Sequence, residues 1–306
     1  MKRKVYIDGE MIPEDEAMIS VFDSSVLVGD SVMELARTFH HKFFRWPLHR
    51  DRLLRSIKGA RMSFGMTPSE LDHVTQEFLE ANLPTIEADD EAFVGHLVSR
   101  GNMGLVQPAS PSTFVMYCFP TSVVLKEKAR YYETGRHVVT PLSRHMHPMT
   151  MDPKIKYRSR LHFSIADAEA QLVDPEAIPL LLDHAGNLAE GTGWNFFVVR
   201  DGKLHTPTER NILAGVSRQT TIELAREMGI TVVERDLQPF DAQNADEAFL
   251  TATSVCMMPV TTFNGQKIAD GQPGPVTRKL LERWQQFLDF DFMAHAQRAA
   301  TKLSTS

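Results

Sequence analysis

Tight-turn signals recur along this chain between short apolar runs, and they constrain the fold more than any other feature. Asp8-Gly9 separates two strand-like segments, Asp201-Gly202 separates two more, and residues 183–187 form a similar turn. An Asp-Gly pair flanked by alternating apolar residues is a strong signal for a β-hairpin. Helical patterns lie between the hairpins without strict βαβ alternation, so the chain is predicted to be an α/β protein of the α+β kind.

The hydrophobic periodicity predicts the individual elements. Helices are expected from about residue 50, over 69–80, from 161, over 217–228, and near residues 280–288. In the helix from residue 161, one face carries Leu161, Ile165, Ala168 and Leu172. The tail after Ala294 is small and polar, so we expect it to fray. Strands are expected at 5–12, 40–46, 92–100, 113–119, 137–142, 178–182, 195–200, 203–206, 231–237 and 248–254.

Length and charge exclude several classes of protein. The chain has 306 residues, and Pro120-Thr121-Ser122 resembles a linker, so we predict domains at residues 1–120 and 121–306. The formal net charge is −6 with no basic block, which argues against nucleic-acid and membrane partners. Two cysteines cannot build a disulfide framework, and no apolar run reaches the roughly 18 residues of a membrane helix. A cytoplasmic globular protein is therefore expected.

Three segments of the second half carry residues able to do chemistry, although each has a simpler explanation. Lys156 ends an extended segment and could form a Schiff base, or it could belong to a solvated basic stripe. Glu190 could project from a strand end into a pocket, or it could be an exposed hairpin residue. The turn Gly215–Ser217 opens a helix whose N–H groups could hold a phosphate, or Ser217 could simply be an N-cap.

In this order and spacing, the three segments resemble the signature of the fold-type IV pyridoxal-phosphate enzymes. That family includes branched-chain amino acid aminotransferases, D-amino acid aminotransferases and aminodeoxychorismate lyases. The resemblance covers almost the whole chain, and it implies a small N-terminal domain, a larger C-terminal domain and a cofactor in the cleft between them. In chain order, the similar segments are Phe22–Glu34, His49–Leu53, Val98–Gly101, Lys156, Glu190–Asn195, Gly215–Arg218 and Leu250–Thr253.

The resemblance implies a role for each matching residue. Lys156 would form a Schiff base with pyridoxal 5′-phosphate and move a proton between the substrate Cα and C4′ of the cofactor. Glu190 would keep the pyridine nitrogen protonated, which makes the ring a better electron sink. The phosphate would be held by the guanidinium of Arg52, the N–H groups of Val216 and Ser217, and the hydroxyls of Ser217 and Thr253.

The segments that would face the substrate depart from parts of the family. Leu161 stands where many of these aminotransferases have a tyrosine. The loop 102–107 lacks the Arg-x-His pattern that traps the substrate carboxylate in D-amino acid aminotransferases, so D-specificity is disfavoured. The pocket wall is expected to be apolar but not aromatic. The residues expected to bind substrate are Val28, Met33, Arg37 and Arg100.

We therefore expect a homodimeric transaminase that moves an amino group between a hydrophobic or branched-chain amino acid and a 2-oxo acid. An aminodeoxychorismate lyase stays open as an alternative, because Lys156–Leu161 and Met258–Val260 resemble the lyases. A transaminase that uses D-amino acids or (R)-amines is a further alternative. No metal site is expected, because His145 and His147 are followed by no suitably spaced third ligand; lining of the substrate cleft is the favoured role for them.

Overall fold

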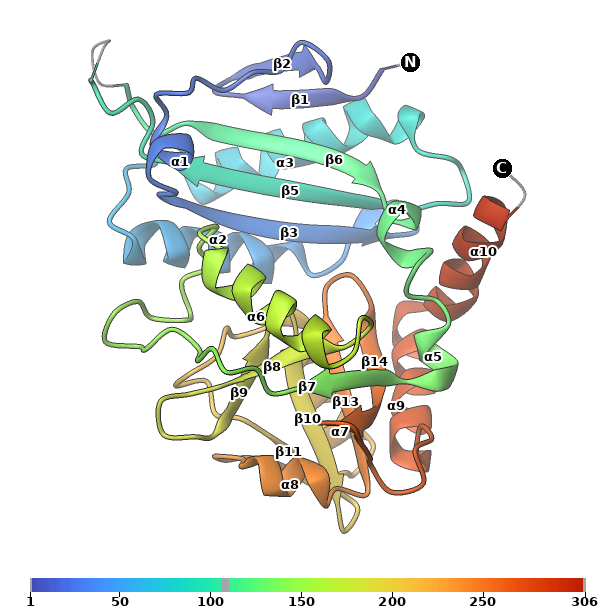
Figure 1. Cartoon of the computed structure of the whole chain (residues 1–306). Coiled ribbons are helices and arrows are strands. Elements are labelled where there is room, and N and C mark those ends of the chain that lie inside the picture. The colour runs from blue at the N-terminus through green and yellow to red at the C-terminus, as the bar shows by residue number, and fades with distance from the viewer. Residues whose placement is uncertain (1, 106–109, 305–306) are drawn as a thin grey trace. The chain divides into compact units, whose positions relative to one another are not determined.

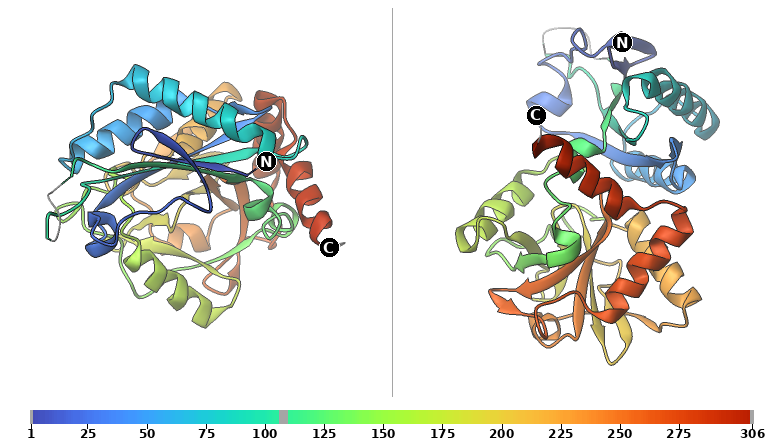
Figure 2. Two further views of the ribbon diagram at one scale, coloured as in Figure 1. Left: turned by 90° about the horizontal axis from the view of Figure 1, so that it is seen from above. Right: turned by 90° about the vertical axis from the view of Figure 1, so that its right-hand side faces the viewer.

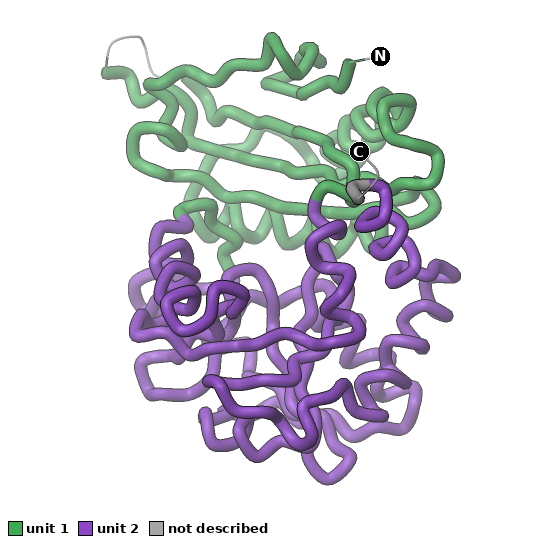
Figure 3. Tube along the Cα trace, turned by 45° about the vertical axis from the view of Figure 1, so that its right-hand side comes forward, with its two compact units in different colours: residues 1–123, 155–159 green, residues 124–154, 160–306 purple. Residues whose placement is uncertain are grey.

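The computed structural model describes residues 2–105 and 110–304, and the chain divides into two compact units (Figure 3). Unit 1 contains Met1–Val123 and Ile155–Ser159, whereas unit 2 contains Val124–Lys154 and Arg160–Ser306. Lys156 therefore belongs to unit 1, although a long stretch of unit 2 precedes it in the sequence. Val106 and Gln107, in the loop that lacks the carboxylate-trap pattern, lie outside the described residues.

Unit 1 is built on an antiparallel sheet of six strands in the order β2-β1-β6-β5-β3-β4 (Figure 1). At the turn between β1 and β2, Asp8 and Gly9 have φ values of 49° and 108°, as a type I′ hairpin requires. His40 and His41 form a similar turn between β3 and β4. The strands are β1 (Lys4–Ile7), β2 (Glu10–Pro13), β3 (Ser31–Phe39), β4 (Lys42–Phe43), β5 (Ala92–Ser99) and β6 (Phe114–Pro120).

Two helices, α2 (Trp46–Gly59) and α3 (Pro68–Asn82), lie on the same face of this sheet (Figure 2). A capping box between Thr67 and Glu70 starts α3. The apolar sides of both helices form the core of unit 1 with the sheet, and each fully buried leucine or phenylalanine contributes about 1.5–3 kcal/mol. The shorter helices are α1 (Ser24–Leu27) and η1 (Leu83–Thr85). The core includes Leu53, Ile57, Leu71, Phe78, Leu79, Val94 and Met116.

Unit 2 is built on a sheet that closes on itself. The strand order is β12-β11-β10-β13-β14-β7-β8-β9, and β9 also pairs with β10, so the six strands from β10 to β9 form a ring. The pairing that closes the ring joins Glu190 to Asn195. The strands are β7 (Arg136–Val139), β8 (Ile178–Leu182), β9 (Leu188–Gly191), β10 (Asn195–Arg200), β11 (Lys203–Thr206), β12 (Val232–Glu234), β13 (Glu247–Ala252), β14 (Cys256–Phe263) and β15 (Gln266–Lys267).

The helices of unit 2 pack around these strands. The indole of Trp284 on α9 is fully buried and donates a hydrogen bond to the hydroxyl of Thr221 on α7, at 3.0 Å. The expected glycine stop of α7 is present, because Gly229 follows the helix with a φ of 74°. The remaining helices are α4 (Ser122–Leu125), α5 (Tyr131–Thr134), α6 (Leu161–Val173), α7 (Val216–Glu227), α8 (Pro239–Gln243), α9 (Pro275–Leu288) and α10 (Phe292–Ser304).

Helix α6 forms where the periodicity predicts it, but it buries a different face. Phe163, Ala166 and Ala170 are buried, whereas Leu161 and Leu172 are 76% and 88% exposed. Both sets recur at helical spacing, so spacing alone could not distinguish the buried face from the exposed one. An apolar stripe on α6 is therefore uncovered within a single chain.

The expected fraying after Ala294 is wrong for the residues that the structure describes. Helix α10 runs to Ser304, and Phe292 and Ala296 on it are buried. The ring of Phe292 lies 5.7 Å from that of Tyr132. The mixed α/β class is confirmed in both units. No helix in the described ranges has the length and apolarity that crossing a membrane requires.

Candidate active site

Lys156 lies in an extended segment, Ile155–Ser159, that runs antiparallel to the start of β3. Its carbonyl oxygen accepts a hydrogen bond from the N–H of Met33 at 2.8 Å. Its own N–H donates to the hydroxyl of Ser56 at 3.0 Å. These bonds fix the backbone of Lys156 on both sides, so the side chain extends from a rigid base.

Lys154 has a different environment two residues earlier. Its ammonium group pairs with Asp152 at 2.9 Å, and its side chain is 48% exposed. An exposed, ion-paired amine is a poor nucleophile compared with a partly buried one on a fixed backbone. The geometry thus favours Lys156 over Lys154, in agreement with the role that the resemblance implies for Lys156.

A buried ion cluster in unit 1 joins Glu34 on β3 to Arg52 and His49 on α2. Nε and Nη2 of Arg52 donate to the two oxygens of Glu34 at 2.8 and 2.5 Å. Nδ1 of His49 and the N–H of Leu35 lie 3.0 and 2.9 Å from the same carboxylate. Three of these contacts converge on Oε1, and Oε2 accepts from Nε of Arg52.

The electrostatics of this cluster fix the charge of each member. Burial alone would raise the pKa of Glu34, but Arg52 and His49 outweigh it and hold that pKa well below its usual range. Burial lowers the pKa of His49, and the charges of Arg52 and Lys156 lower it further against the pull of Glu34. The cluster is therefore a carboxylate paired with a permanent cation and a neutral imidazole at pH 7.

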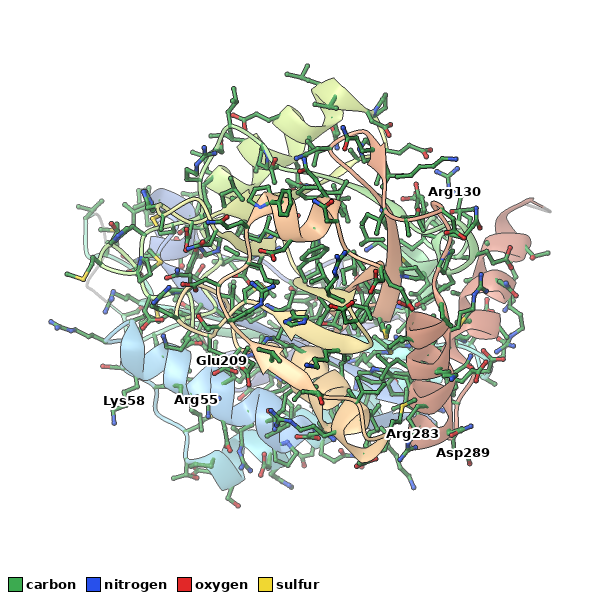
Figure 4. The ribbon with its side chains drawn as sticks, turned by 90° about the horizontal axis from the view of Figure 1, so that it is seen from below. Arg55, Lys58, Arg130, Glu209, Arg283 and Asp289 are labelled. Carbon is green, nitrogen blue, oxygen red and sulfur yellow. The ribbon has the colours of Figure 1, made fainter. Side chains whose placement is uncertain are left out.

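The contact with Glu34 uses part of the guanidinium that the family resemblance assigns to a phosphate. A phosphate would have to use N–H groups of Arg52 other than those on Nε and Nη2 that Glu34 accepts, and a guanidinium has five N–H donors. Arg55 and Lys58 project from the same helix and are exposed (Figure 4). Arg52 differs from both because it is only 4% exposed.

Two of the expected substrate-binding residues lie between the end of α1 and the start of β3 in unit 1. Val28 follows α1 and is 61% exposed. Met33 is 7% exposed on β3, where its N–H bonds to the carbonyl of Lys156. Met33 therefore has a direct backbone connection to the proposed cofactor lysine, whereas Val28 has an open side chain.

The other two, Arg37 and Arg100, make contacts within unit 1. Arg37 is buried, and its guanidinium lies 4.2 Å from the centre of the Phe39 ring. Nε of Arg100 donates to Asp30 at 2.6 Å, and its terminal nitrogens donate to the carbonyls of residues 60 and 61. Both side chains therefore stabilise the fold of unit 1, and their part in substrate binding stays a prediction.

Glu190 lies on β9, at the pairing that closes the ring of strands. Its carboxylate is buried, and it accepts hydrogen bonds from the side-chain amide of Asn195 at 3.2 Å and from the N–H of Leu213 at 3.1 Å. Nε2 of His145 lies 3.0 Å from the other oxygen. Three contacts leave about one acceptor position on this carboxylate. Glu190 can therefore accept one more N–H group.

The position of His145 differs from the cleft lining that the sequence suggests. Its imidazole is buried against Glu190, although the two residues are far apart in the sequence. Burial favours the neutral imidazole, yet the hydrogen bond and charge of Glu190 raise the pKa of His145. His147 instead packs its ring 4.8 Å from that of His184. Within residues 2–105 and 110–304, no three side chains of metal-binding type gather.

Helix α7 begins next to the same carboxylate, with Gly215 as an N-cap that has no side-chain cap bond. A Cβ at Gly215 would lie 2.1 Å from Oδ1 of Asn195, so this close approach requires glycine. Val216 and Ser217 occupy the first turn, where backbone N–H groups and the helix dipole favour an anion. Thr253 lies in the turn between β13 and β14.

A cavity of about 280 Å³ lies within unit 2, beside the residues that follow Glu190 and flank Thr253. Two basic side chains line it, Lys128 and Arg136. The guanidinium of Arg136 also donates to the carbonyl of Glu176 at 2.9 Å and lies 4.0 Å from the centre of the Tyr131 ring. Burial and the charge of Arg136 lower the pKa of Lys128. The other lining residues are Ile178, Thr192, Gly193, Trp194, Leu250, Ala252, Ser254, Val255 and Met258.

Comparison with known proteins shows which family has this sequence and fold. The family model described as amino-transferase class IV matches residues 31–263. A putative branched-chain-amino-acid aminotransferase of Methanocaldococcus jannaschii is 32% identical over 92% of this chain and 95% of its own. A D-alanine aminotransferase of Listeria monocytogenes is 29% identical over 90% and 93%, respectively. The crystal structure of a T.th. branched-chain amino acid aminotransferase with pyridoxamine 5′-phosphate superposes with a TM-score of 0.85, at 26% identity over 94% of both chains.

These matches first define a class: an enzyme that transfers amino groups with the help of pyridoxal 5′-phosphate. The chain belongs to the class IV aminotransferase family, whose structures share its fold. The family, the fold type and the cofactor inferred from the motifs are confirmed.

Unit 2 contains groups that suit this cofactor. Glu190 has an acceptor position for a protonated ring nitrogen, and the uncapped start of α7 offers N–H groups to a phosphate. In addition, the hydroxyl of Thr251, opposite Asn195 in the sheet, is buried without a hydrogen-bond partner among the described residues. The sequence predicts no contact of Asn195, Leu213 or His145 with Glu190, because these contacts depend on how distant segments pair.

Proposed function

We propose that this aminotransferase moves an amino group between a hydrophobic or branched-chain amino acid and a 2-oxo acid. The observation that carries the substrate class is the match to relatives named as branched-chain aminotransferases, which covers more than nine-tenths of this chain. The buried apolar side chain of Met33, whose N–H bonds to the carbonyl of Lys156, suits the same class.

Lys156 is the proposed attachment point of the cofactor and the proposed base. When bound, pyridoxal 5′-phosphate supplies the electron sink that stabilises negative charge at the substrate Cα. The hydrogen bonds to Met33 and Ser56 hold the Lys156 backbone. Because the backbone is fixed, the side-chain amine needs less conformational ordering to reach the proton that it transfers.

The remaining site residues hold the cofactor in this proposal. Glu190 accepts the N–H of the ring at its fourth acceptor position and so keeps the nitrogen protonated. Fixing the ring at its nitrogen and its phosphate orients the reacting carbon, which contributes to the rate by positioning. The proposed phosphate ligands are Arg52, Val216, Ser217 and Thr253, and the proposed substrate contacts are Val28, Met33, Arg37 and Arg100.

We also propose that the enzyme acts as a homodimer in the cytoplasm. The exposed stripe of Leu161, Ile165 and Leu172 on α6 supports the dimer, because large uncovered apolar patches are characteristic of interfaces. Two buried free cysteines suit a reducing compartment. If α6 lies in the interface, Leu172→Glu should convert the dimer to a monomer in light scattering, whereas the exposed Glu282→Gln on α9 should not.

A panel of amino donors tests the substrate class. Purified holoenzyme is mixed with both enantiomers of leucine, valine and alanine and with a chiral amine, and the visible absorbance is followed. We expect the L-forms of leucine and valine to change the absorbance and a 2-oxo acid to restore it. A response to D-amino acids or amines alone would contradict the proposal. Consumption of aminodeoxychorismate without net change of the cofactor would favour the lyase.

Replacement of the lysine tests the attachment point. Lys156→Ala should abolish the covalent link, read by mass spectrometry after borohydride reduction, and lower kcat at least about a thousandfold. Lys154→Ala is the matched control, and it should keep both the link and the activity. A cofactor still linked to the Lys156→Ala chain would place the attachment elsewhere.

A further inference from the structure

Among the residues that the structure describes, His145 is the one in contact with the Glu190 carboxylate that can change its charge near neutral pH. Asn195 and the Leu213 N–H are neutral donors at every pH. The charge on His145 therefore decides whether Glu190 has a cationic neighbour. No motif in the sequence points to this contact.

The two ring nitrogens of His145 both face acceptors. Nε2 lies 3.0 Å from a carboxylate oxygen of Glu190, and Nδ1 lies 3.2 Å from the carbonyl oxygen of Met146. A neutral imidazole carries one N–H and could satisfy only one of these acceptors. An imidazolium carries two and satisfies both. The geometry of the pocket thus selects the charged form.

The titratable groups around His145 agree with a cation at this position. Glu190 on β9 and Asp183 after β8 both favour the charged ring, and together with its hydrogen bonds they raise the pKa of His145 despite its burial. The ring of His162 on α6 lies 6.4 Å away. Burial lowers the pKa of His162 to about 4, and the charges of His145 and Arg160 add to that effect. His162 is therefore neutral at pH 7 and does not compete for the carboxylate.

We propose that His145 is a positioning residue, held as an imidazolium between the Met146 carbonyl and Glu190, that fixes the orientation of the Glu190 carboxylate. The consequence for the cofactor rests on the proposed role of Glu190. An imidazolium donates to Glu190 and to the Met146 carbonyl at the same time, whereas a neutral ring leaves one of these acceptors facing a lone pair. The carboxylate is then held less firmly toward the ring nitrogen of the cofactor. The enzyme should then lose affinity for the protonated ring as pH rises through the pKa of His145.

The first test uses the cofactor-free chain and does not depend on its function. Histidine ¹⁵N signals of the protein are titrated by NMR, and the His145 signal is identified by its loss in His145→Gln. We expect His145 to titrate above the ordinary value of about 6.5. In Glu190→Gln, its pKa should fall by about one pH unit or more. A His145 pKa that is not raised, or that Glu190→Gln leaves in place, would overturn the ion pair.

The second test measures binding of pyridoxamine 5′-phosphate, which forms no covalent link and so reports the non-covalent contacts alone. His145→Gln keeps a donor but loses the charge, and it should weaken binding roughly ten- to a hundredfold at pH 7. His145→Arg keeps a permanent cation, so binding should stay close to the wild type and should lose the pH dependence assigned to His145. His147→Gln, in the same loop but away from Glu190, is the control and should bind like the wild type.

The outcomes separate the two proposals. If His145→Gln binds the ligand as tightly as the wild type while the NMR titration shows the ion pair, the positioning role is wrong. If the wild type itself binds no pyridoxamine 5′-phosphate, the proposed role of Glu190 fails and the positioning role fails with it. The ion pair is still decided by the NMR titration in that case.

Discussion

Each unit of this enzyme contains a buried carboxylate beside a histidine, and the two sites differ in how they fix charge. Glu34 in unit 1 is bound by Arg52, which is charged at every accessible pH, and by His49, whose pKa is lowered. Glu190 in unit 2 is bound by neutral amide donors and by His145, whose pKa is raised. The first carboxylate has a permanent partner, whereas the second has a titratable one.

The hydrogen-bond contacts of the two carboxylates also differ in number. Glu34 has four contacts, three of them on Oε1, and they join a strand to a helix. Glu190 has three contacts and one remaining position. The comparison shows that the charge of the partners, a permanent cation in one case and a titratable ring in the other, distinguishes the two carboxylates, whereas burial and a histidine neighbour do not.

The largest expected effect is on the free energy of unfolding, and it should be much larger for a substitution of Glu34 than for one of Glu190. Glu34→Gln leaves the buried Arg52 without its counter-charge, so the free energy of unfolding should fall by about 3–5 kcal/mol in urea titrations. Glu190→Gln should cost much less stability, because His145 can release its proton and the neutral donors can still bond to the amide oxygen. It should instead lower kcat by a factor on the order of a hundred or more.

The matched control for Glu34 is an ion pair at the surface of the same unit. Asp72→Asn removes the pair between Arg50 and Asp72, which spans 2.6 Å between partly exposed side chains. It should cost no more than about 1 kcal/mol. Equal losses of stability in Glu34→Gln and Glu190→Gln would remove the distinction between the two sites.

A smaller effect is expected in the pH dependence of stability, through a histidine of unit 1. Burial lowers the pKa of His96 to about 3, so the folded chain keeps this ring neutral where the unfolded chain, with a pKa near 6.5, binds a proton. Stability should therefore fall as pH drops from about 6.5, by up to about 1.4 kcal/mol per pH unit for this one group. His96→Gln should flatten the slope by that amount, as measured by unfolding at several pH values. An unchanged slope would show that His96 does not bind its proton on unfolding.

The smallest effect concerns the neutral donors around Glu190. Asn195→Ala removes one hydrogen bond to Glu190 and one to the carbonyl of Leu213. The carboxylate keeps His145 and the Leu213 N–H, so the loss of stability should be about 1–2 kcal/mol. Asn244→Ala, which removes an exposed amide bond at the end of α8, should lose less in the same urea titration. If Asn195→Ala lost as much stability as Glu34→Gln, the neutral donors around Glu190 would not act independently of the charged His145.

Much of the fold could be predicted because its signals are local. The strands at 178–182, 195–200 and 203–206 have the predicted bounds, since β-branched and aromatic runs end at Asp-Gly or similar turns. The strands β3, β9, β14 and β15 are not among the expected strands, and β9 and β14 show why. Strand β9 is short and ends at a glycine, and β14 contains Pro259 and begins at Cys256 with a φ of 58°. Both depend on pairing with distant strands.

The site divides in the same way. Lys156, Glu190 and the Gly215 turn lie in contiguous motifs, so the sequence could suggest them. The contact between His145 and Glu190 could not be predicted, because it forms only when the segment before Lys156 meets the strand β9. Nor could the sequence show that residues 155–159 pair with β3 and so belong to the first compact unit.

The pairing of Glu190 with Asn195 also links ring closure to the proposed site in unit 2. The residue proposed to meet the cofactor is the same residue whose backbone completes the ring of strands. A chain with β9 detached would lose the positioned carboxylate and the ring closure together, whereas Lys156 and Arg52 belong to unit 1. Such a half-assembled molecule would keep the proposed attachment point but lose the proposed contact to the ring nitrogen.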